Sequence, residues 1–195
     1  MGSDKALLRI SGRALAVVVV DAMVAAGADR VVALGGDRTA LVAEGLTVVA
    51  DRYPGEGPLG GILTALGHFE DSTKPVVVMA CDLPAADARN VAAVVEALGD
   101  SDGPAVAVPV VEGRRQWMHA SWTPATAPLL AAAFMDGERA TWRAAEVLVD
   151  SGLRILEVDG PVPTGFGDVD QPLDLSPNQS AAEISEDPAD LETGR

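Results

Sequence analysis

Residues 75–84 read PVVVMACDLP, a short apolar run that ends in a cysteine, an aspartate and a proline. The run at residues 75–80 is uniformly apolar, which predicts a β-strand that is covered on both faces. Helices on both faces of a parallel sheet are the usual way to bury such a strand. The stretch therefore indicates an α/β fold, with Asp82 just beyond the end of a strand.

The sequence on either side continues this alternation of strand and helix. Helices are predicted over residues 12–26, 59–69, 86–98, 124–135 and 140–150, and strands over residues 30–35, 46–50, 105–110, 116–122 and 154–158. Glu112, Gly113 and Arg114 separate two of these strands and predict a hairpin. Together the pattern predicts a three-layer α/β/α fold, with a mostly parallel sheet and one antiparallel excursion.

The composition is acidic and poor in aromatic residues. The 195 residues carry a formal net charge of −15 at pH 7, and 48% of them are hydrophobic but only 4% aromatic. Nucleic-acid-binding proteins concentrate Lys and Arg against phosphates, so nucleic acid is excluded as the expected partner. An acidic surface also repels anionic membranes and anionic ligands, so a phosphate-bearing ligand requires a local cation or a metal ion.

The chain shows no sign of export or membrane insertion. Cys81 is its single cysteine, and no basic segment followed by an apolar one opens the sequence. The apolar stretch at residues 14–20 is too short to cross a bilayer. We expect a cytoplasmic protein with one domain over residues 1–175 and an acidic, disordered tail over residues 176–195.

Carboxylates follow three of the predicted strands. Asp51 and Asp82 each follow a strand, and Asp168 and Asp170 come after the last one. In open α/β sheets ligands bind beyond the carboxyl ends of the strands, so converging carboxylates there could hold Mg²⁺ together with phosphate oxygens. Lys5 could supply the cation that balances those phosphates.

Each of these residues also has a purely structural interpretation. An aspartate after a strand is a common turn or helix-capping residue, which applies to both Asp51 and Asp82. Lys5 alone is typical of a solvated surface lysine. Cys81 is expected to be a small buried residue rather than a nucleophile. The glycines of residues 54–61 permit either close approach to a ligand or a tight turn.

The histidines and tryptophans give weaker signals. His68 and His119 lie far apart and lack the spacing of zinc ligands, so a structural metal has little support. Trp117, Met118 and Trp122 are expected to pack in the core or to line the rim of a pocket.

Taken in order, five segments resemble the molybdenum cofactor guanylyltransferase family. They are MGSDKALL at residues 1–8, VVADRYPGEGPLGGILTAL at 48–66, ACDLP at 80–84, DGERATWR at 136–143 and GDVDQPLDL at 167–175. The first is similar to the second half of the family signature L-A-G-G-x-S-x-R-M-G-x-D-K-x-L-L, and the third to its C-D-M-P metal loop. The resemblance covers most of the chain in order, which makes it more specific than any single motif.

The resemblance implies a Rossmann-like fold and a nucleotidyltransferase that moves GMP from GTP to the phosphate of molybdopterin, with Mg²⁺ as cofactor and pyrophosphate released. It implies that Lys5 and Asp82 are catalytic and that Asp82 and Asp170 bind the metal ion. The nucleotide-binding residues that it implies are Gly2, Lys5, Asp51, Gly57, Pro58 and Gly60. Relatives on the same fold transfer CMP to molybdopterin or GMP to phospholactate, and a non-catalytic role in cofactor assembly is a further alternative.

The chain departs from the family pattern in two places. The segment L-A-G-G-x-S-x-R does not occur in it, and Asp168 and Asp170 stand where the family has asparagines. In the family the missing segment would cradle the triphosphate, so we expect the chain by itself to bind GTP weakly. The resemblance also predicts that translation starts upstream of Met1 and that the first strand of the sheet is missing. The strands next to the missing one would then have unpaired edges and a gap between helices, so we expect the chain alone to be marginally stable or to aggregate.

Overall fold

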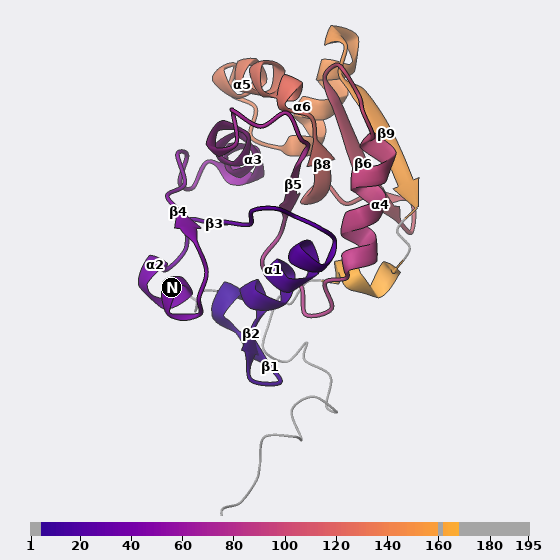
Figure 1. Cartoon of the computed structure of the whole chain (residues 1–195). Coiled ribbons are helices and arrows are strands. Elements are labelled where there is room, and N and C mark those ends of the chain that lie inside the picture. The colour runs from indigo at the N-terminus through magenta and orange to yellow at the C-terminus, as the bar shows by residue number, and fades with distance from the viewer. Residues whose placement is uncertain (1–4, 160–161, 168–195) are drawn as a thin grey trace, which may run out of the picture.

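A computed structural model describes residues 5–159 and 162–167 of the chain (Figure 1). Its helices are α1 (Leu15–Ala25), α2 (Arg38–Ala43), α3 (Gly57–His68), α4 (Ala88–Leu98), α5 (Ala127–Met135) and α6 (Thr141–Leu148). Its strands are β1 (Arg9–Ile10), β2 (Arg13–Ala14), β3 (Ala33–Leu34), β4 (Val48–Val49), β5 (Val76–Met79), β6 (Ala105–Val111), β7 (Arg114–Arg115), β8 (His119–Trp122) and β9 (Arg154–Asp159). None of the helices in these ranges has both the length and the apolar character needed to cross a membrane. The predicted acidic tail lies outside the described residues.

The larger sheet contains β5, β8, β6, β7 and β9. β8 lies between β5 and β6 and is antiparallel to both, whereas β9 is parallel to β6. It follows that β5, β6 and β9 run in one direction, and that β7, which is also antiparallel to β6, and β8 form the antiparallel excursion. At the predicted hairpin, Glu112 and Gly113 have φ angles of 51° and 74°, the left-handed conformation that a two-residue hairpin turn requires. The predicted α/β fold is confirmed.

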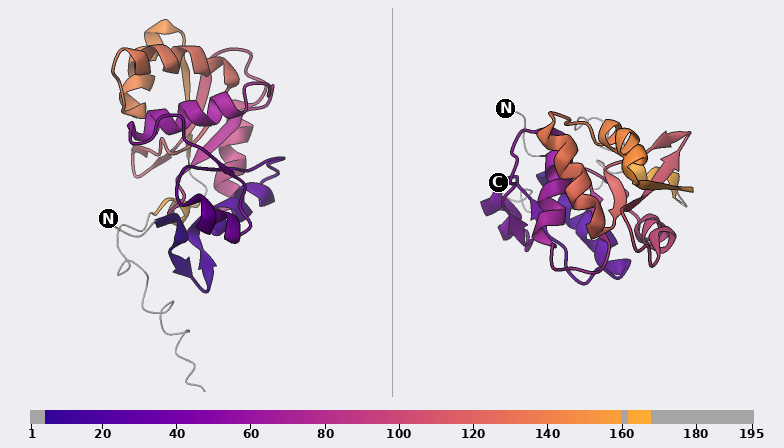
Figure 2. Two further views of the ribbon diagram at one scale, coloured as in Figure 1. Left: turned by 90° about the vertical axis from the view of Figure 1, so that its left-hand side faces the viewer. Right: turned by 90° about the horizontal axis from the view of Figure 1, so that it is seen from above.

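Helices cover both faces of this sheet, as the apolar strands require. Within β6, Ala105 and Ala107 pack against α4, while Val106 and Val108 face the large core beneath α3 and α5. Side chains alternate between the two faces of a strand, so a strand that is covered on both sides is apolar throughout. Figure 2 shows α4 on one side of the sheet and the pair α3 and α5 on the other.

A second, two-stranded sheet consists of β3 and β4, which pair in parallel with Ala33 opposite Val48. In the described part of the chain, no strand joins β3 to the larger sheet. β3 and β5 instead line a common cavity of about 570 Å³. The gap that the resemblance predicts is therefore present in the structure.

Two local features differ from the sequence-based expectations. α2 was not predicted, although Asp37 caps it by accepting a hydrogen bond from the Ala40 amide at 3.1 Å. The helix predicted from residue 12 begins at Leu15, because Ser11 and Gly12 form the turn between β1 and β2 with positive φ angles. α2 has only six residues, too few to show a helical period in the sequence.

Candidate active site

The structure brings Lys5 and Asp82 together. Lys5 begins a 3₁₀ turn (Lys5–Leu7) near the start of the chain, and Asp82 lies in the loop between β5 and α4. The Lys5 ammonium nitrogen lies 3.6 Å from a carboxylate oxygen of Asp82, and their side chains are 42% and 18% exposed. Two residues that are distant in sequence thus form a solvent-accessible ion pair just beyond the end of β5.

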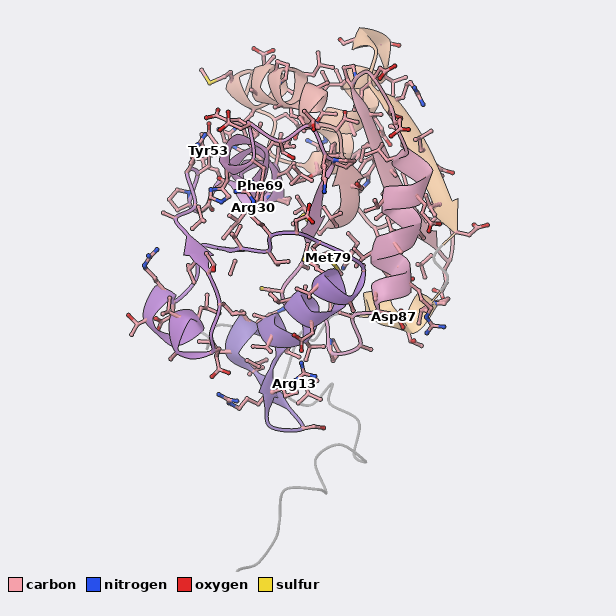
Figure 3. The ribbon with its side chains drawn as sticks, viewed as in Figure 1. Arg13, Arg30, Tyr53, Phe69, Met79 and Asp87 are labelled. Atoms are coloured by element: carbon pink, nitrogen blue, oxygen red, sulfur yellow. The ribbon has the colours of Figure 1, made fainter. Side chains whose placement is uncertain are left out.

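Asp82 is not the residue that caps α4. That role belongs to Asp87, whose carboxylate accepts a hydrogen bond from the Arg89 amide at 2.8 Å (Figure 3). Hydrogen bonds from the Arg89 side chain, and then from its amide, hold the pKa of Asp87 below its ordinary value. The capping interpretation of Asp82 is therefore wrong.

Asp51 holds the turn that follows β4. Its Oδ1 accepts hydrogen bonds from the Tyr53 amide at 3.0 Å and from the Thr64 hydroxyl at 2.8 Å. The Thr64 oxygen in turn accepts a hydrogen bond from the Arg52 amide at 3.1 Å. The turn interpretation of Asp51 is confirmed, and its predicted role in nucleotide binding remains a prediction. Asp51 also borders the cavity between β3 and β5.

Gly57, Pro58 and Gly60 form the first turn of α3, and close packing accounts for both glycines. A Cβ at Gly60 would lie 2.9 Å from the Cβ of Tyr53, so any larger residue there would force a neighbouring atom to shift. A Cβ at Gly57 would lie 3.3 Å from the carbonyl oxygen of Arg139, and Gly57 has a φ angle of +80°. Whether this turn also contacts a nucleotide remains a prediction.

Arg139 connects the start of α3 to the segment between α5 and α6. Its Nη1 donates hydrogen bonds to the carbonyl oxygens of Phe134 at 2.8 Å and Glu138 at 2.9 Å, and its Nε pairs with Glu56. Glu138 in turn accepts hydrogen bonds from the amides of Ala140 and Arg139, which hold its pKa below the ordinary value. The sequence comparison identified the G-E-R segment but not this structural role.

The remaining predicted residues have mixed outcomes. Cys81 is exposed and borders the cavity between β3 and β5, so the expectation of a buried cysteine is wrong. Trp122 is fully buried in the core, while Trp117 and Met118 line a second cavity of about 360 Å³, as expected of these residues. Gly2, Asp168 and Asp170 lie outside the described residues.

The described residues offer a limited set of metal ligands. Within residues 5–159 and 162–167, no group of three or more His, Cys, Asp or Glu side chains is arranged to hold a metal ion. A nucleotide-associated Mg²⁺ requires only one or two carboxylates, because waters and phosphate oxygens complete its coordination. The partly exposed carboxylate of Asp82 fits this requirement.

Comparison with known proteins identifies relatives of this fold. Residues 1–151 match the family model of the MobA-like NTP transferase domain. Molybdopterin-guanine dinucleotide biosynthesis protein A from Archaeoglobus fulgidus is similar with a TM-score of 0.68 at 19% identity, covering 93% of this chain and 91% of that one. A comparison with curated protein sequences gives no significant match.

Two further solved structures have the same fold. A nucleotidyl transferase from Methanothermobacter matches with a TM-score of 0.68 at 20% identity, covering 91% of this chain and 84% of that one. The 2-C-methyl-D-erythritol 4-phosphate cytidylyltransferase of Thermus thermophilus matches with a TM-score of 0.57 at 21% identity, covering 94% and 95% of the two chains. At these identities the similarity establishes the fold and leaves the substrate open.

Proposed function

The chain belongs to the MobA-like NTP transferase domain family, and from this premise we propose that it transfers GMP from GTP to molybdopterin in a reaction that depends on Mg²⁺. The observation that carries the proposal is the Lys5–Asp82 pair, which lies beyond the end of β5. Ligands of open α/β sheets bind at this edge. The sequence segments that resemble the guanylyltransferase family support GTP and molybdopterin as the specific substrates.

Nucleotidyl transfer makes few covalent demands on the protein. An oxygen of the acceptor phosphate forms a bond to the α-phosphorus of GTP, and the bond from that phosphorus to the bridging oxygen breaks. Pyrophosphate leaves with the electron pair of the broken bond. Catalysis of this kind depends on positioning the phosphates and neutralising their charge, so no side-chain nucleophile is needed.

Lys5 and Asp82 have complementary roles in this proposal. The Lys5 ammonium donates hydrogen bonds to phosphate oxygens, and the Asp82 carboxylate holds the metal ion. Mg²⁺, when bound, supplies positive charge that offsets the triphosphate. A divalent metal ion is typical of nucleotidyltransferases in this family. The protein itself carries a formal charge of −15 and therefore repels the triphosphate, so local cations are needed to bind it.

The test is pyrophosphate release from GTP in the presence of Mg²⁺ and molybdopterin. We expect Asp82→Asn to lower kcat by about 10²–10³-fold, the usual loss when one group that stabilises transition-state charge is removed. Asp87→Asn is the matched control, because Asp87 lies in the same loop, caps α4, and an asparagine retains the cap. An Asp82→Asn variant as active as the Asp87→Asn variant contradicts the proposed role of Asp82.

Two alternatives are decided by the same assay. One similar structure is a cytidylyltransferase, so CTP is assayed beside GTP, and preferential use of CTP replaces guanylyl transfer with cytidylyl transfer. The other alternative is a non-catalytic role in cofactor assembly, so a version of the chain that carries the family segment L-A-G-G-x-S-x-R ahead of Met1 is assayed as well. Failure of both this chain and a version carrying that segment to release pyrophosphate would establish the non-catalytic alternative.

The compartment that we propose for the protein is the cytoplasm, and cell fractionation tests this proposal.

A further inference from the structure

The second cavity, of about 360 Å³, has two tryptophans in its wall and is called the tryptophan cavity below. Trp117 lies two residues before β8, and Trp142 is the second residue of α6. The other lining residues include Pro58, Met118, Arg139 and Thr141. Large aromatic side chains in a cavity wall offer flat faces on which a planar ring can stack.

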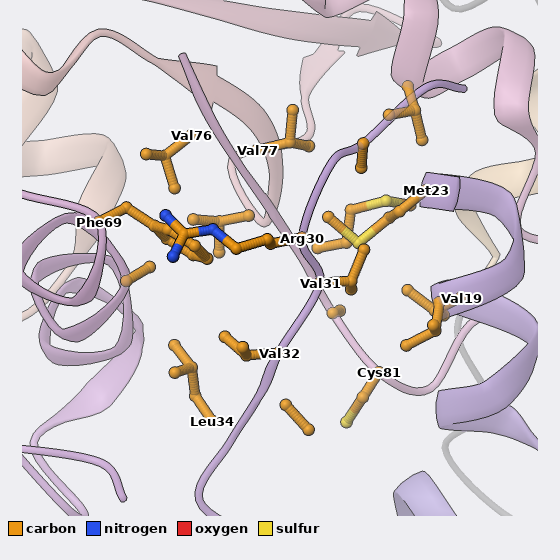
Figure 4. Close-up of a pocket in the computed structure, with 18 of the residues that line it drawn as sticks. Val19, Met23, Arg30, Val31, Val32, Leu34, Phe69, Val76, Val77 and Cys81 are labelled. Atoms are coloured by element: carbon orange, nitrogen blue, oxygen red, sulfur yellow. The ribbon is translucent and has the colours of Figure 1, made fainter. Parts of the chain in front are cut away.

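The larger cavity, between β3 and β5, has a different lining. Figure 4 shows valine side chains around it, and Phe69 is the one aromatic side chain among the described residues that line it. It therefore has no pair of aromatic side chains between which a ring could bind. Of the two cavities, the tryptophan cavity is the candidate for a planar ligand.

Neighbouring side chains hold both tryptophans in place. Trp117 packs against the fully buried Trp122 with ring centroids 6.4 Å apart, and the Arg115 guanidinium lies 5.8 Å from the Trp117 centroid. The Arg143 guanidinium lies 4.9 Å from the centroid of Trp142. An arginine over one face of a ring leaves the opposite face for a ligand, and Trp142 is 45% exposed. Trp142 can therefore contact a ligand without any rearrangement of the core.

The wall of the tryptophan cavity also includes a buried hydroxyl that lacks a hydrogen bond. Thr141 lines the cavity and is 2% exposed, and its hydroxyl has no partner among the described residues. Most buried polar side chains in proteins are hydrogen-bonded, so this exception marks a candidate contact for a ligand. A heterocyclic ring carries nitrogen and oxygen atoms on its edge that can pair with a hydroxyl, whereas a purely apolar ring carries none.

The tryptophan cavity lies close to Asp82. The carbonyl oxygen of Met118, one of its lining residues, accepts a hydrogen bond from the Ala80 amide at 2.9 Å, and Ala80 precedes Asp82 by two residues. Two residues span at most about 7 Å, so the backbone of Asp82 lies within about 10 Å of Met118. A single ligand that has a ring and a short side chain can thus reach from the cavity to Asp82.

The position of the tryptophan cavity favours the acceptor over the nucleotide as its ligand. Two residues predicted to contact the nucleotide lie on the β3 side of β5, because Asp51 and the neighbour of Lys5, Ala6, border the larger cavity there. Trp117 precedes β8, which pairs with the opposite edge of β5. Transfer between two ligands requires a subsite for each, with the reacting groups between them. The predicted nucleotide contact Pro58 lines the tryptophan cavity, so the two subsites would adjoin at the start of α3.

We propose that the tryptophan cavity binds the fused heterocyclic ring of the acceptor against Trp117 and Trp142, with the acceptor phosphate directed to Asp82. The pterin of molybdopterin suits this site, because it carries nitrogen and oxygen atoms on a flat pyrimidine ring. The proposal rests on the proposed nucleotidyl transfer and adds to it the residues that select the acceptor by its ring.

The test is equilibrium dialysis of the chain against pterin, the fused ring without a side chain. Pterin has no phosphate and cannot accept a nucleotidyl group, so its binding is measured independently of activity. Trp142→Leu keeps an apolar side chain but removes the aromatic face, whereas Trp142→Phe keeps an aromatic face. Val147→Ala changes another exposed apolar residue of α6 and is the matched control. Circular dichroism checks that each variant is folded.

We expect Trp142→Leu to raise the Kd for pterin by about tenfold, the usual order of the loss when one aromatic stacking partner of a base is removed. Trp142→Phe should restore most of this affinity, and Val147→Ala should bind pterin as the unchanged chain does. Equal Kd values for Trp142→Leu and Trp142→Phe would overturn the proposal, as would a folded chain that does not bind pterin.

Guanosine is dialysed beside pterin to test the nucleotide as the alternative ligand. If Trp142→Leu weakens the binding of guanosine but not that of pterin, the cavity belongs to the nucleotide and the proposal is wrong. Pterin binding without pyrophosphate release would support this site and contradict the proposed transfer. Transfer to molybdopterin by a chain that does not bind pterin would overturn this site alone, so the two failures are distinguishable.

Discussion

Thr64 is the buried polar residue on which the turn at Asp51 depends. It is fully buried in α3, where its hydroxyl donates to the Asp51 carboxylate and accepts from the Arg52 amide. The surrounding sequence of α3 is almost entirely apolar, and this single threonine in an apolar run was the signal that could have identified it. The pattern of apolar residues shows which face of a helix is buried, but it does not show which groups a buried hydroxyl hydrogen-bonds.

Replacement of Thr64 by valine tests this dependence. Thr64→Val keeps the shape of the side chain but removes the hydroxyl, which leaves the Arg52 amide and the Asp51 carboxylate short of a partner. We expect the free energy of unfolding to fall by about 1–2 kcal/mol, measured by urea denaturation. Amide exchange at Arg52 should accelerate in Thr64→Val but not in Thr64→Ser, which retains the hydroxyl. Equal exchange at Arg52 in both variants would contradict the hydrogen-bonding role of Thr64.

At the candidate site, the sequence predicted Lys5 and Asp82 as functional residues but not the distance between them. Both were identified from sequence, because each belongs to a segment that resembles the guanylyltransferase family. Their separation of 3.6 Å depends on the path of the chain between them and is a property of the folded molecule. Arg139 was not identified as a structural residue, because its partners Glu56 and Phe134 lie on other elements.

At the scale of elements, α3 contains two adjacent glycines that meet opposite surroundings. A Cβ at Gly61 would meet no other atom within 4 Å, whereas a Cβ at Gly60 would lie 2.9 Å from that of Tyr53. The sequence G-G cannot reveal this difference, since both positions lie in the same helical turn. The difference arises because Gly60 faces the loop at Tyr53.

The pair gives a matched test of the packing around α3. We expect Gly61→Ala to raise the free energy of unfolding by about 0.5–1 kcal/mol, because alanine loses less backbone entropy in a helix than glycine does. Gly60→Ala should lower it by about 1–3 kcal/mol, because the new methyl group forces the Tyr53 loop to move. Thermal unfolding of both variants measures the two effects. A Gly60→Ala variant as stable as Gly61→Ala would show that the Tyr53 loop is not fixed against α3.

At the scale of the whole molecule, the cavity between β3 and β5 separates a small apolar cluster from the large core of the protein. The large core packs α3, α5 and α6 against the five-stranded sheet. A small cluster of Ala6, Ala16, Leu41 and Val48 joins α1, α2 and β4 on the other side of the gap. In the described residues no strand pairing joins β3 to the five-stranded sheet, so the two parts are expected to open independently.

Amide exchange measured under native conditions tests this division. The amides of Ala33 and Gly35, which donate to the carbonyl oxygens of Thr47 and Val49, should exchange about tenfold or more faster than the amides of β6. The amides of both groups are hydrogen-bonded to a neighbouring strand. The β6 amides therefore serve as an internal control for the slowing of exchange that such a hydrogen bond alone produces. Protection of equal strength on both sides of the gap would mean that the molecule unfolds as one unit.

The sequence by itself determined the alternation of strands and helices, the antiparallel excursion, and the residues that resemble a nucleotidyltransferase. It could do so because apolar periodicity, turn residues and ordered motifs are local properties of the chain. Only the tertiary structure decided that Lys5 meets Asp82, that Asp87 rather than Asp82 caps α4, and that Cys81 is exposed at a cavity. These features depend on which segments meet in space, and contacts between distant segments leave no period in the sequence.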